Sequence, residues 1–198
     1  MSTVVRDCFS YADLALPGTL GIVALMSCPG ARAGQAADAN PAEDLQRDFS
    51  VISSRGLRMV VSCLEPRELP LEPQHYQGLY EKERIDWEIV PIPDYHAPSP
   101  TQDTLLTRLF DSVDLRLRFG EKVGFHCYGG LGRTGTVVAR YLIHKGLTPG
   151  EAIRYIRDNY NSRAIETIAQ EEYLKLCRRP ARGALAEPAG DASALTKE

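Results

Sequence analysis

The sequence predicts an α/β protein, a three-layer sandwich with a central mixed, mainly parallel sheet flanked by helices. Short apolar runs bounded by proline, glycine or charged residues are typical of buried strands, and four such runs lie at residues 20–26, 58–64, 87–92 and 123–125. Segments with apolar residues at helical spacing lie between them. Strands that alternate with helices favour parallel pairing, because the intervening helix carries the chain back so that the next strand can run in the same direction as the one before.

Start and stop signals place six helices in the sequence. Asn40 precedes Pro41 and Glu43, an N-cap pattern in which the Asn side chain accepts a hydrogen bond from the first turn. Thr148 and Thr167 each precede a Glu or Gln by three residues, which is the pattern of a capping box. The helices predicted in this way span residues 40–55, 76–82, 101–119, 134–145, 148–159 and 167–177.

The helix predicted at 101–119 has the clearest amphipathic pattern. Its apolar residues form one stripe, and polar residues occupy the opposite face. The stripe consists of Leu105, Leu106, Leu109, Phe110, Val113 and Leu117. The helix that begins at Thr134 is expected to be amphipathic as well, with apolar residues on one side and Arg140, His144 and Lys145 on the other.

The remaining segments carry no clear pattern of strand or helix. Residues 1–16 are mixed in character, and 31–39 is a loop of small residues. The prolines of 91–100 keep that segment out of any helix or sheet. The last segment, 180–198, is rich in Ala, Gly, Pro and charged residues, so we expect a disordered tail. Residues 1–179 then form one domain.

Composition limits the function classes. The chain has 198 residues and a formal net charge of −3, which gives no reason to expect nucleic acid or an anionic membrane as a partner. Its five cysteines are widely spaced without a disulfide framework, which is typical of a reducing compartment. We expect a cytoplasmic, monomeric protein without a signal peptide, a metal or a cofactor.

One stretch joins an apolar strand to a helix through a glycine-rich turn, Gly124-Phe125-His126-Cys127-Tyr128-Gly129-Gly130-Leu131-Gly132-Arg133-Thr134-Gly135-Thr136. Glycines between Cys127 and Arg133 allow backbone N–H groups to converge, and the helix N-terminus adds further donors. Together these groups form a cradle for a tetrahedral dianion such as phosphate. The planar Arg133 fork can bind two phosphoryl oxygens, and the positive field favours the thiolate form of Cys127.

This His-Cys-x5-Arg-Thr stretch resembles the signature of the protein tyrosine phosphatase superfamily, in its small dual-specificity branch. The resemblance implies a cysteine-phosphatase fold, with Cys127 as the phosphorylated nucleophile and Arg133 as the phosphate clamp. It also implies that Thr134 stabilises the leaving thiolate and that His126 fixes the Cys127 backbone without touching substrate. The loop residues that would surround the phosphate are Tyr128, Gly129, Gly130, Leu131, Gly132 and Arg133.

Two other interpretations of this stretch exist. Cys127 could be a buried structural cysteine on a tight turn. A zinc site at His126 and Cys127 is weaker, because adjacent residues of a strand point to opposite faces and no partner Cys-x2-Cys is present.

Catalysis also needs a proton for the leaving oxygen. In the family this proton comes from an aspartate on a mobile loop that follows the preceding strand, some tens of residues before the cysteine. Asp94 fits, because it follows a predicted strand and lies in a proline-rich loop. Asp86 precedes a strand, and Asp103 belongs to a helix. The alternative for Asp94 is an ordinary turn, where aspartate is common.

Two further residues have both a functional and a structural interpretation. The run from Ser162 to Gln170 resembles a segment of the cyclin-dependent-kinase-associated phosphatases, in which a glutamine near the cleft orients the attacking water. However, Gln170 also completes the capping box of Thr167. Cys63 ends a strand expected beside the one that ends at Cys127, where some family members carry a cysteine that traps the oxidised nucleophile as a disulfide. A small buried hydrophobic residue is the alternative.

The resemblance also bears on substrate. Inositide-specific relatives carry lysines in the cradle, whereas no charged residue lies between Cys127 and Arg133 here. This favours a phosphorylated protein, with a kinase as one candidate, over a lipid headgroup. The chain is also too short for the insertion that builds a deep phosphotyrosine-only pocket, so phosphoserine and phosphothreonine are expected substrates beside phosphotyrosine. The alternatives are a phosphoinositide or small-molecule phosphate hydrolase, and a non-catalytic module that binds phosphosites or kinases.

Overall fold

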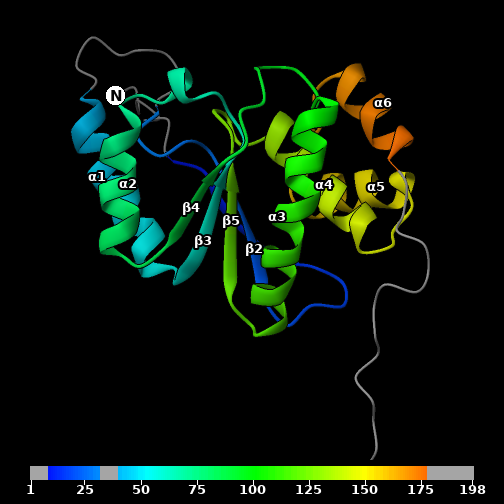
Figure 1. Ribbon diagram of the computed structural model, residues 1–198, viewed down its shortest axis with the longest axis horizontal. Coiled ribbons are helices and arrows are strands. Elements are labelled where there is room, and N and C mark those ends of the chain that lie inside the picture. The colour runs from blue at the N-terminus through cyan, green and yellow to red at the C-terminus, as the bar shows by residue number, and fades with distance from the viewer. Residues whose placement is uncertain (1–8, 32–39, 178–198) are drawn as a thin grey trace, which may run out of the picture.

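The computed structural model describes residues 9–31 and 40–177. Its centre is one sheet, whose strands are β1 (Tyr11–Ala15), β2 (Ile22–Met26), β3 (Leu57–Ser62), β4 (Asp86–Ile89) and β5 (Lys122–His126). The strand order is β1-β2-β5-β3-β4, and Figure 1 labels the last four of these strands in that order. β1 and β2 are antiparallel, and every other neighbouring pair is parallel. The mixed, mainly parallel sheet predicted from the sequence is confirmed.

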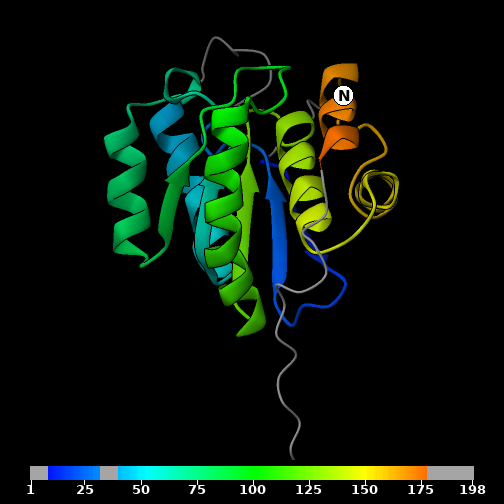
Figure 2. The same ribbon diagram turned by 45° about the vertical axis from the view of Figure 1, so that its right-hand side comes forward.

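Helices cover both faces of this sheet, so the predicted three-layer sandwich is also confirmed. One face carries α1 (Pro41–Ser54) and α2 (Pro73–Lys82), and the short 3-10 helix η1 (Pro66–Glu68) lies between β3 and α2 in the chain. The other side carries α3 (Pro100–Arg118), α4 (Gly132–His144), α5 (Pro149–Asn159) and α6 (Ile168–Leu176). α3 and α4 pack on the sheet, and α5 and α6 pack on α4, which the turned view of Figure 2 separates clearly.

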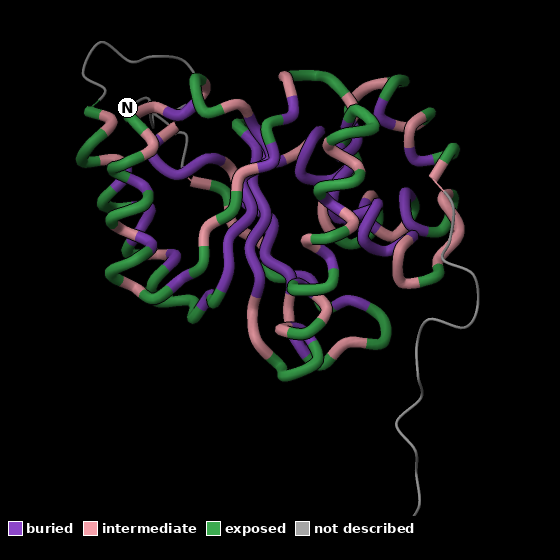
Figure 3. Tube along the Cα trace, viewed as in Figure 1, coloured by how far each residue is buried: buried purple, intermediate pink, exposed green. Residues whose placement is uncertain are grey.

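Each face of the sheet has its own hydrophobic core. Val123 and Phe125 of β5 point to the side of α3 and α4, because alternate residues of a strand share a face. Ala24 and Met26 of β2 pack with Phe49 of α1 in the core on the other side. Figure 3 shows the result: the central strands are buried, and exposed residues follow the outer sides of the helices.

The three predicted helix caps are confirmed. Asn40 accepts a hydrogen bond from the N–H of Glu43, and Thr148 and Thr167 form complete capping boxes. These bonds satisfy donors that a helix N-terminus otherwise leaves unpaired. The predicted bounds of α1, α3, α4, α5 and α6 agree with the structure to within two residues at each end.

Several strand and helix bounds differ from the prediction. β1 arises in a segment without a recognised pattern, because an edge strand that is mostly half-buried needs no apolar run. The strands predicted at 20–26 and 87–92 are shorter, and the exposed Leu20 lies before β2. α2 begins earlier than predicted, at Pro73, which takes the first helical position.

The prediction that α4 is amphipathic was wrong. Every residue from Gly132 to Ile143 is buried, including Arg140. The cause is the position of α4, which is enclosed by the sheet and α3 on one side and by α5 and α6 on the other. Arg140 tolerates burial because its Nε donates to Asp103 at 2.8 Å. Conversely, Leu105, which was placed in the apolar stripe of α3, is exposed.

Two expectations concern segments outside the described residues. The tail predicted at 180–198 lies there, as does most of the loop predicted at 31–39. In the part of the chain that the structure does describe, no helix combines the length and apolar character required to cross a bilayer.

Candidate active site

The predicted cradle lies at the carboxyl end of β5. This strand runs between β2 and β3, and its last residue, His126, is level with Met26 and Ser62. The chain then turns through residues 127–131 and enters α4 at Gly132. Open α/β sheets bind ligands at the carboxyl ends of their strands, where the connections diverge to either side. The structure therefore brings strand, loop and helix N-terminus together in the predicted order.

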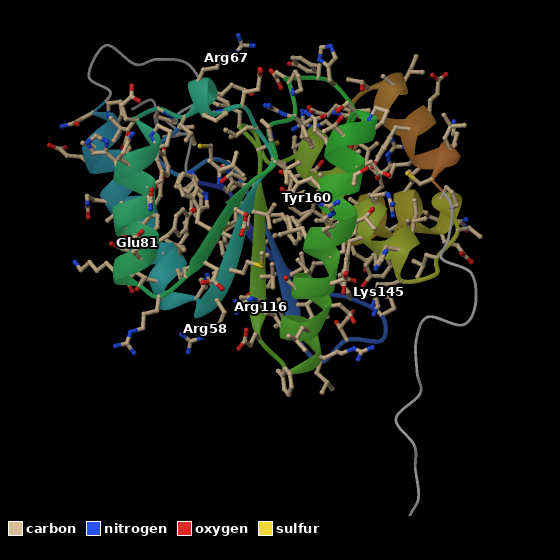
Figure 4. The ribbon with its side chains drawn as sticks, in the orientation of Figure 1. Arg58, Arg67, Glu81, Arg116, Lys145 and Tyr160 are labelled. Carbon is tan, nitrogen blue, oxygen red and sulfur yellow. The ribbon has the colours of Figure 1, made fainter. Side chains whose placement is uncertain are left out.

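The loop encloses the sulfur of Cys127, which is 3% exposed. The N–H of Gly130 donates to Cys127 Sγ at 3.2 Å. Gly130 has a φ of +81°, and a Cβ there would lie 2.5 Å from the Met26 carbonyl oxygen, so glycine is required. On the outer side, the hydroxyl of Tyr160, labelled in Figure 4, donates to the Gly130 carbonyl at 2.9 Å. The loop conformation is thus held by contacts on several sides.

Thr134 lies in the first turn of α4. Its side chain is buried, and its hydroxyl has no hydrogen-bond partner among the described residues. A buried hydroxyl without a partner is costly, so such a group calls for an explanation. A thiolate at Cys127 or a phosphate oxygen in the cradle would complete it, which agrees with the role that the resemblance implies for Thr134.

Arg133 is 2% exposed and is held by two carboxylates. Its Nη1 and Nη2 donate to the two oxygens of Glu68 at 2.7 and 2.8 Å, and Nη2 also lies 2.8 Å from Asp94 Oδ1. Burial alone would lower the pKa of Arg133, but the hydrogen bonds to Glu68 and the nearby charges of Cys127, Glu68 and Asp94 together raise that pKa. For Glu68, burial raises the pKa and the hydrogen bond from Arg133 lowers it, and the net pKa is lowered. Both groups are therefore charged at neutral pH.

The structure brings Asp94 to the cradle, because the loop that follows β4 places this carboxylate 2.8 Å from Nη2 of Arg133. Asp94 accepts the N–H of Tyr95 at 3.0 Å, and its carbonyl accepts a hydrogen bond from His96 Nδ1 at 2.7 Å. Tyr95 has a φ of +59°, a conformation that side chains rarely adopt and that is concentrated at functional sites. The Asp94 carboxylate is 57% exposed, so it remains accessible to a ligand.

His126 points away from the cradle. It is fully buried in the sheet, and its Nδ1 lies 3.2 Å from the Cys127 carbonyl oxygen. Burial lowers the pKa of His126 to about 4, so the imidazole is neutral at physiological pH. The contact of Nδ1 with the Cys127 carbonyl is of the kind that the resemblance implies, and the expectation that His126 does not touch substrate stays a prediction.

Sequence reasoning missed two carboxylates near the cradle. Glu68 belongs to η1, directly after the carboxyl end of β3, and holds the guanidinium of Arg133. The Glu166 carboxylate lies against Gly132, in the space that a Cβ on this glycine would need. A sequence signal for such residues does exist. Ligands bind at the carboxyl ends of parallel strands, so any charged residue that follows a predicted strand is a candidate for the site.

Gln170 is buried, and both ends of its amide group make hydrogen bonds. Its Oε1 accepts the N–H groups of Glu166 and Thr167, at 2.9 and 3.2 Å, as the capping box requires. Its Nε2 donates to the carbonyl of His96 at 3.3 Å, which ties α6 to the loop of Asp94. The structural role of Gln170 is therefore present, and its predicted role in orienting water stays a prediction.

Cys63 lies beside Cys127. The parallel register pairs Ser62 with His126, so the next residue of each strand is a cysteine, and the Cys63 N–H donates to the His126 carbonyl at 2.6 Å. Both thiols are free and belong to the same core. Burial raises the pKa of Cys63 well above its ordinary value, so this thiol is protonated at neutral pH.

Charge at the mouth of the site is mixed. Glu68, Asp94 and Glu166 contribute carboxylates around the cradle. Arg67 projects outward from η1 in Figure 4 and pairs with Glu65 at 2.7 Å. Among the described residues, no cluster of three or more His, Cys, Asp or Glu side chains is placed to hold a metal ion.

Comparison with known proteins adds to this geometry. The family model described as "Polymorphic toxin system, DSP-PTPase phosphatase" matches residues 33–147, more than half of the chain. Among curated proteins, Cyclin-dependent kinase inhibitor 3 of Sus scrofa is 31% identical over 134 residues, which cover 66% of this chain and 62% of that protein. The chain thus spans less than two thirds of the length of this relative.

Solved structures with a similar fold were also found. Tk-PTP in its active form is 31% identical and superposes with a TM-score of 0.62 over 82% of this chain and 93% of that chain. Kinase associated phosphatase, with its catalytic-site cysteine replaced by serine, superposes with a TM-score of 0.69 over 84% of this chain and 92% of that chain. At 24% identity, this second likeness shows a shared fold.

Proposed function

Because this chain belongs to the dual-specificity protein tyrosine phosphatase family, we propose that it is a cysteine-dependent phosphoprotein phosphatase. It would hydrolyse phosphotyrosine, and phosphoserine and phosphothreonine as well, through a phosphocysteine intermediate. The observation that carries this proposal is the buried sulfur of Cys127, which accepts the Gly130 N–H in the loop that leads directly to Arg133.

In the first step, Cys127 Sγ attacks phosphorus in line with the leaving oxygen. The S–P bond forms as the bond from phosphorus to the substrate oxygen breaks. Loop N–H groups and Arg133 stabilise the charge on the equatorial oxygens, and Asp94 donates a proton to the leaving oxygen. The contact between Asp94 and Arg133 supports this assignment, because it keeps the acid beside the group that binds phosphate.

In the second step, water attacks the phosphocysteine. Asp94 accepts a proton from the water, and the S–P bond breaks to release inorganic phosphate and the thiolate. The hydroxyl of Thr134, which has no partner within the described part of the chain, then donates to the departing sulfur. Gln170 Nε2 uses one of its two N–H donors for the His96 carbonyl, and the other is the group that would orient the water.

The rim of the site supports a protein substrate. A polyanionic lipid headgroup needs several cations, whereas carboxylates gather around the cradle. Tyr95, Tyr128 and Ile168 are exposed large apolar side chains, and Tyr95 is tied to the start of α6 by the Thr167 hydroxyl at 3.2 Å. Such surface suits a peptide chain on either side of one phosphate. Since one relative is named as a kinase inhibitor, a phosphorylated kinase is a candidate substrate.

Hydrolysis of para-nitrophenyl phosphate tests the activity. Wild-type protein should turn over this compound, and Cys127→Ser should lower kcat by at least about a thousandfold, since the hydroxyl is a far weaker nucleophile. A panel of phosphotyrosine, phosphothreonine and phosphoinositide substrates then separates the proposed function from lipid hydrolysis. Wild-type activity equal to that of Cys127→Ser would contradict the enzyme proposal and favour a non-catalytic module.

Asp94→Ala tests the acid in the same assay. Loss of general acid–base catalysis should lower kcat by about 10²-fold or more and leave KM within a few-fold, because the cradle is intact. Glu88→Ala, at an exposed position of the preceding strand, serves as the control and should retain full activity. Full activity of Asp94→Ala would remove Asp94 from the mechanism.

The predicted redox role of Cys63 belongs to the same proposal. A peroxide converts the Cys127 thiolate to a sulfenic acid with release of water or alcohol, and attack by Cys63 then forms a disulfide with loss of water. Adjacent positions on paired strands support this pairing. Peptide mapping after peroxide treatment should show a Cys63–Cys127 bridge that Cys63→Ala lacks, and its absence in the wild type would end the idea. The cytoplasmic location and monomeric state stay predictions.

A further inference from the structure

Three side chains form a continuous hydrogen-bonded chain behind the cradle. The indole Nε1 of Trp87 lies 2.7 Å from Ser62 Oγ. Ser62 Oγ lies 2.6 Å from His126 Nε2. His126 Nδ1 lies 3.2 Å from the carbonyl oxygen of Cys127. Ser62 and His126 are fully buried, so water does not substitute for any of these contacts.

The chemistry of the first member fixes the direction of the rest. An indole N–H only donates, so Ser62 Oγ accepts from Trp87. Among the described residues, the Ser62 hydroxyl hydrogen then has one acceptor within hydrogen-bond distance, the Nε2 of His126, which must accept. A neutral imidazole that accepts at Nε2 carries its proton on Nδ1. That proton points at the Cys127 carbonyl oxygen, which can only accept.

The opposite tautomer, with the proton on Nε2, leaves both ring nitrogens of His126 with unfavourable contacts. A proton on Nε2 would leave the buried Ser62 hydroxyl without an acceptor in the described structure, and it would set the bare Nδ1 against the Cys127 carbonyl oxygen. Each unsatisfied buried group costs on the order of 1–3 kcal/mol. Burial also keeps His126 uncharged, so the doubly protonated form does not compete.

We propose that Ser62 and Trp87 are positioning residues that hold neutral His126 as its Nδ1–H tautomer and so fix the backbone of Cys127. A trans peptide directs its C=O and N–H oppositely, so anchoring the Cys127 carbonyl at His126 turns the Tyr128 N–H the other way, away from the sheet interior. Trp87 is itself held by stacking on Tyr76 and Tyr80, at ring distances of 5.9 and 5.4 Å. The aromatic cluster beside β4 is thereby coupled to the nucleophile. This inference rests on the proposed function.

Variants of Ser62 and Trp87 test the proposal. Ser62→Ala removes the hydroxyl, and Trp87→Phe removes the N–H but keeps a ring against the aromatic cluster. Each should lower kcat for para-nitrophenyl phosphate by about tenfold and leave KM within about twofold, because one hydrogen bond is lost and the phosphate ligands remain. Alkylation of Cys127 by iodoacetamide at pH 6.5 should slow by a similar factor, since the thiolate is the reactive form. Ser62→Thr keeps a hydroxyl at this position, so it should retain most of the wild-type kcat that Ser62→Ala loses.

Tyr80→Phe is the matched control. Tyr80 stacks on Trp87, and its buried hydroxyl has no partner among the described residues. Removing this hydroxyl therefore alters the same aromatic cluster but leaves the hydrogen bonds from Trp87 through Ser62 to His126 in place. This variant should retain the wild-type kcat. A loss equal to that of Trp87→Phe would show that packing alone is responsible, and the proposal would be overturned.

The tautomer of His126 gives a readout that is independent of activity and of variant folding. Long-range ¹H–¹⁵N spectra of the wild type, assigned by the loss of the His126 signals in His126→Asn, show which ring nitrogen carries the proton. A proton on Nδ1 is expected, and a proton on Nε2 would overturn the proposal. An inactive wild type with the proton on Nδ1 would contradict the phosphatase function while supporting the tautomer, so the two failures are distinguishable.

Discussion

Arg133 is the residue at which three segments of the chain meet. Arg133 itself lies in the first turn of α4, Glu68 comes from η1, and the loop after β4 supplies both Asp94 and the Ile92 carbonyl, which accepts from Nη1 at 2.9 Å. The guanidinium is therefore oriented before phosphate arrives, which reduces the conformational entropy lost on binding. A phosphate bound by Arg133 would in turn share or replace the contact with Asp94, which the proposed role of this carboxyl group requires.

Glu68→Gln tests how far activity depends on this orientation. Gln removes the charge but keeps the shape, so the buried guanidinium loses its bidentate partner. We expect kcat/KM for para-nitrophenyl phosphate to fall about tenfold and the free energy of unfolding in urea to fall by about 2 kcal/mol. Glu65→Gln is the control, because Glu65 pairs with the exposed Arg67 and should change stability by less than about 0.5 kcal/mol. Equal effects in both variants would contradict the role of Glu68.

His126 makes stability depend on pH. Its folded pKa of about 4 is below the unfolded value of about 6.5, so the folded state resists protonation. This contribution is present above pH 6.5 and is lost as pH falls toward 4. Over that interval wild type should lose about 3 kcal/mol more of its free energy of unfolding than His126→Asn does, as urea titrations at pH 7, 5.5 and 4 would measure. Parallel losses in the two proteins would refute this assignment.

The cradle residues could be predicted from the sequence because their chemistry is local. Cys127 and Arg133 are six positions apart, and the turn that brings them together is specified by the residues between them. Glu68 and Ser62 could not be found in this way. Their partners are 65 and 64 positions away, so their roles depend on the pairing of β3 with β5, which local patterns do not reveal.

At the scale of elements, the turn between β5 and α4 depends on one glycine. Gly130→Ala places a Cβ against the Met26 carbonyl at a positive φ, whereas Gly129 has open space around its position. We expect Gly130→Ala to displace the loop N–H groups, to lower kcat/KM by at least about a hundredfold and to lower the melting temperature by several degrees. Gly129→Ala should melt within about two degrees of wild type. Wild-type kinetics in Gly130→Ala would contradict a loop conformation in which residue 130 has a positive φ and lies against the Met26 carbonyl.

Elements were predictable where a local signal defined them. The capping residues Asn40, Thr148 and Thr167 identified α1, α5 and α6 because each cap bonds within its own first turn. β1 and the burial of α4 were missed for the opposite reason. An edge strand is defined by its pairing with β2, and α4 is enclosed by elements that follow it in the chain. Both depend on tertiary contacts that override the local pattern.

The whole molecule is built so that separate segments converge on one end of the sheet. η1, the loop before α3, the cradle and the start of α6 all lie at the carboxyl edge. They are joined by side-chain contacts across the site, from Glu68 to Arg133, from Arg133 to Asp94, and from Gln170 to His96. A ligand held by these segments together should therefore stabilise the fold as a whole.

Inorganic phosphate provides the test at this scale. A ligand that binds only the folded state, at one hundred times its dissociation constant, raises the free energy of unfolding by about 2.7 kcal/mol. We expect this increase in wild type and in Asp94→Ala, which retains the cradle. Arg133→Lys keeps a positive charge but loses the planar fork, so its response to the same phosphate concentration should fall to less than about 1 kcal/mol. The measurement is urea unfolding with sulfate-free phosphate against chloride at matched ionic strength. An equal response of wild type and Arg133→Lys would mean that phosphate acts as a general stabilising salt, and the cradle would then lack the specific anion site that the arrangement of Gly130, Arg133 and Thr134 implies.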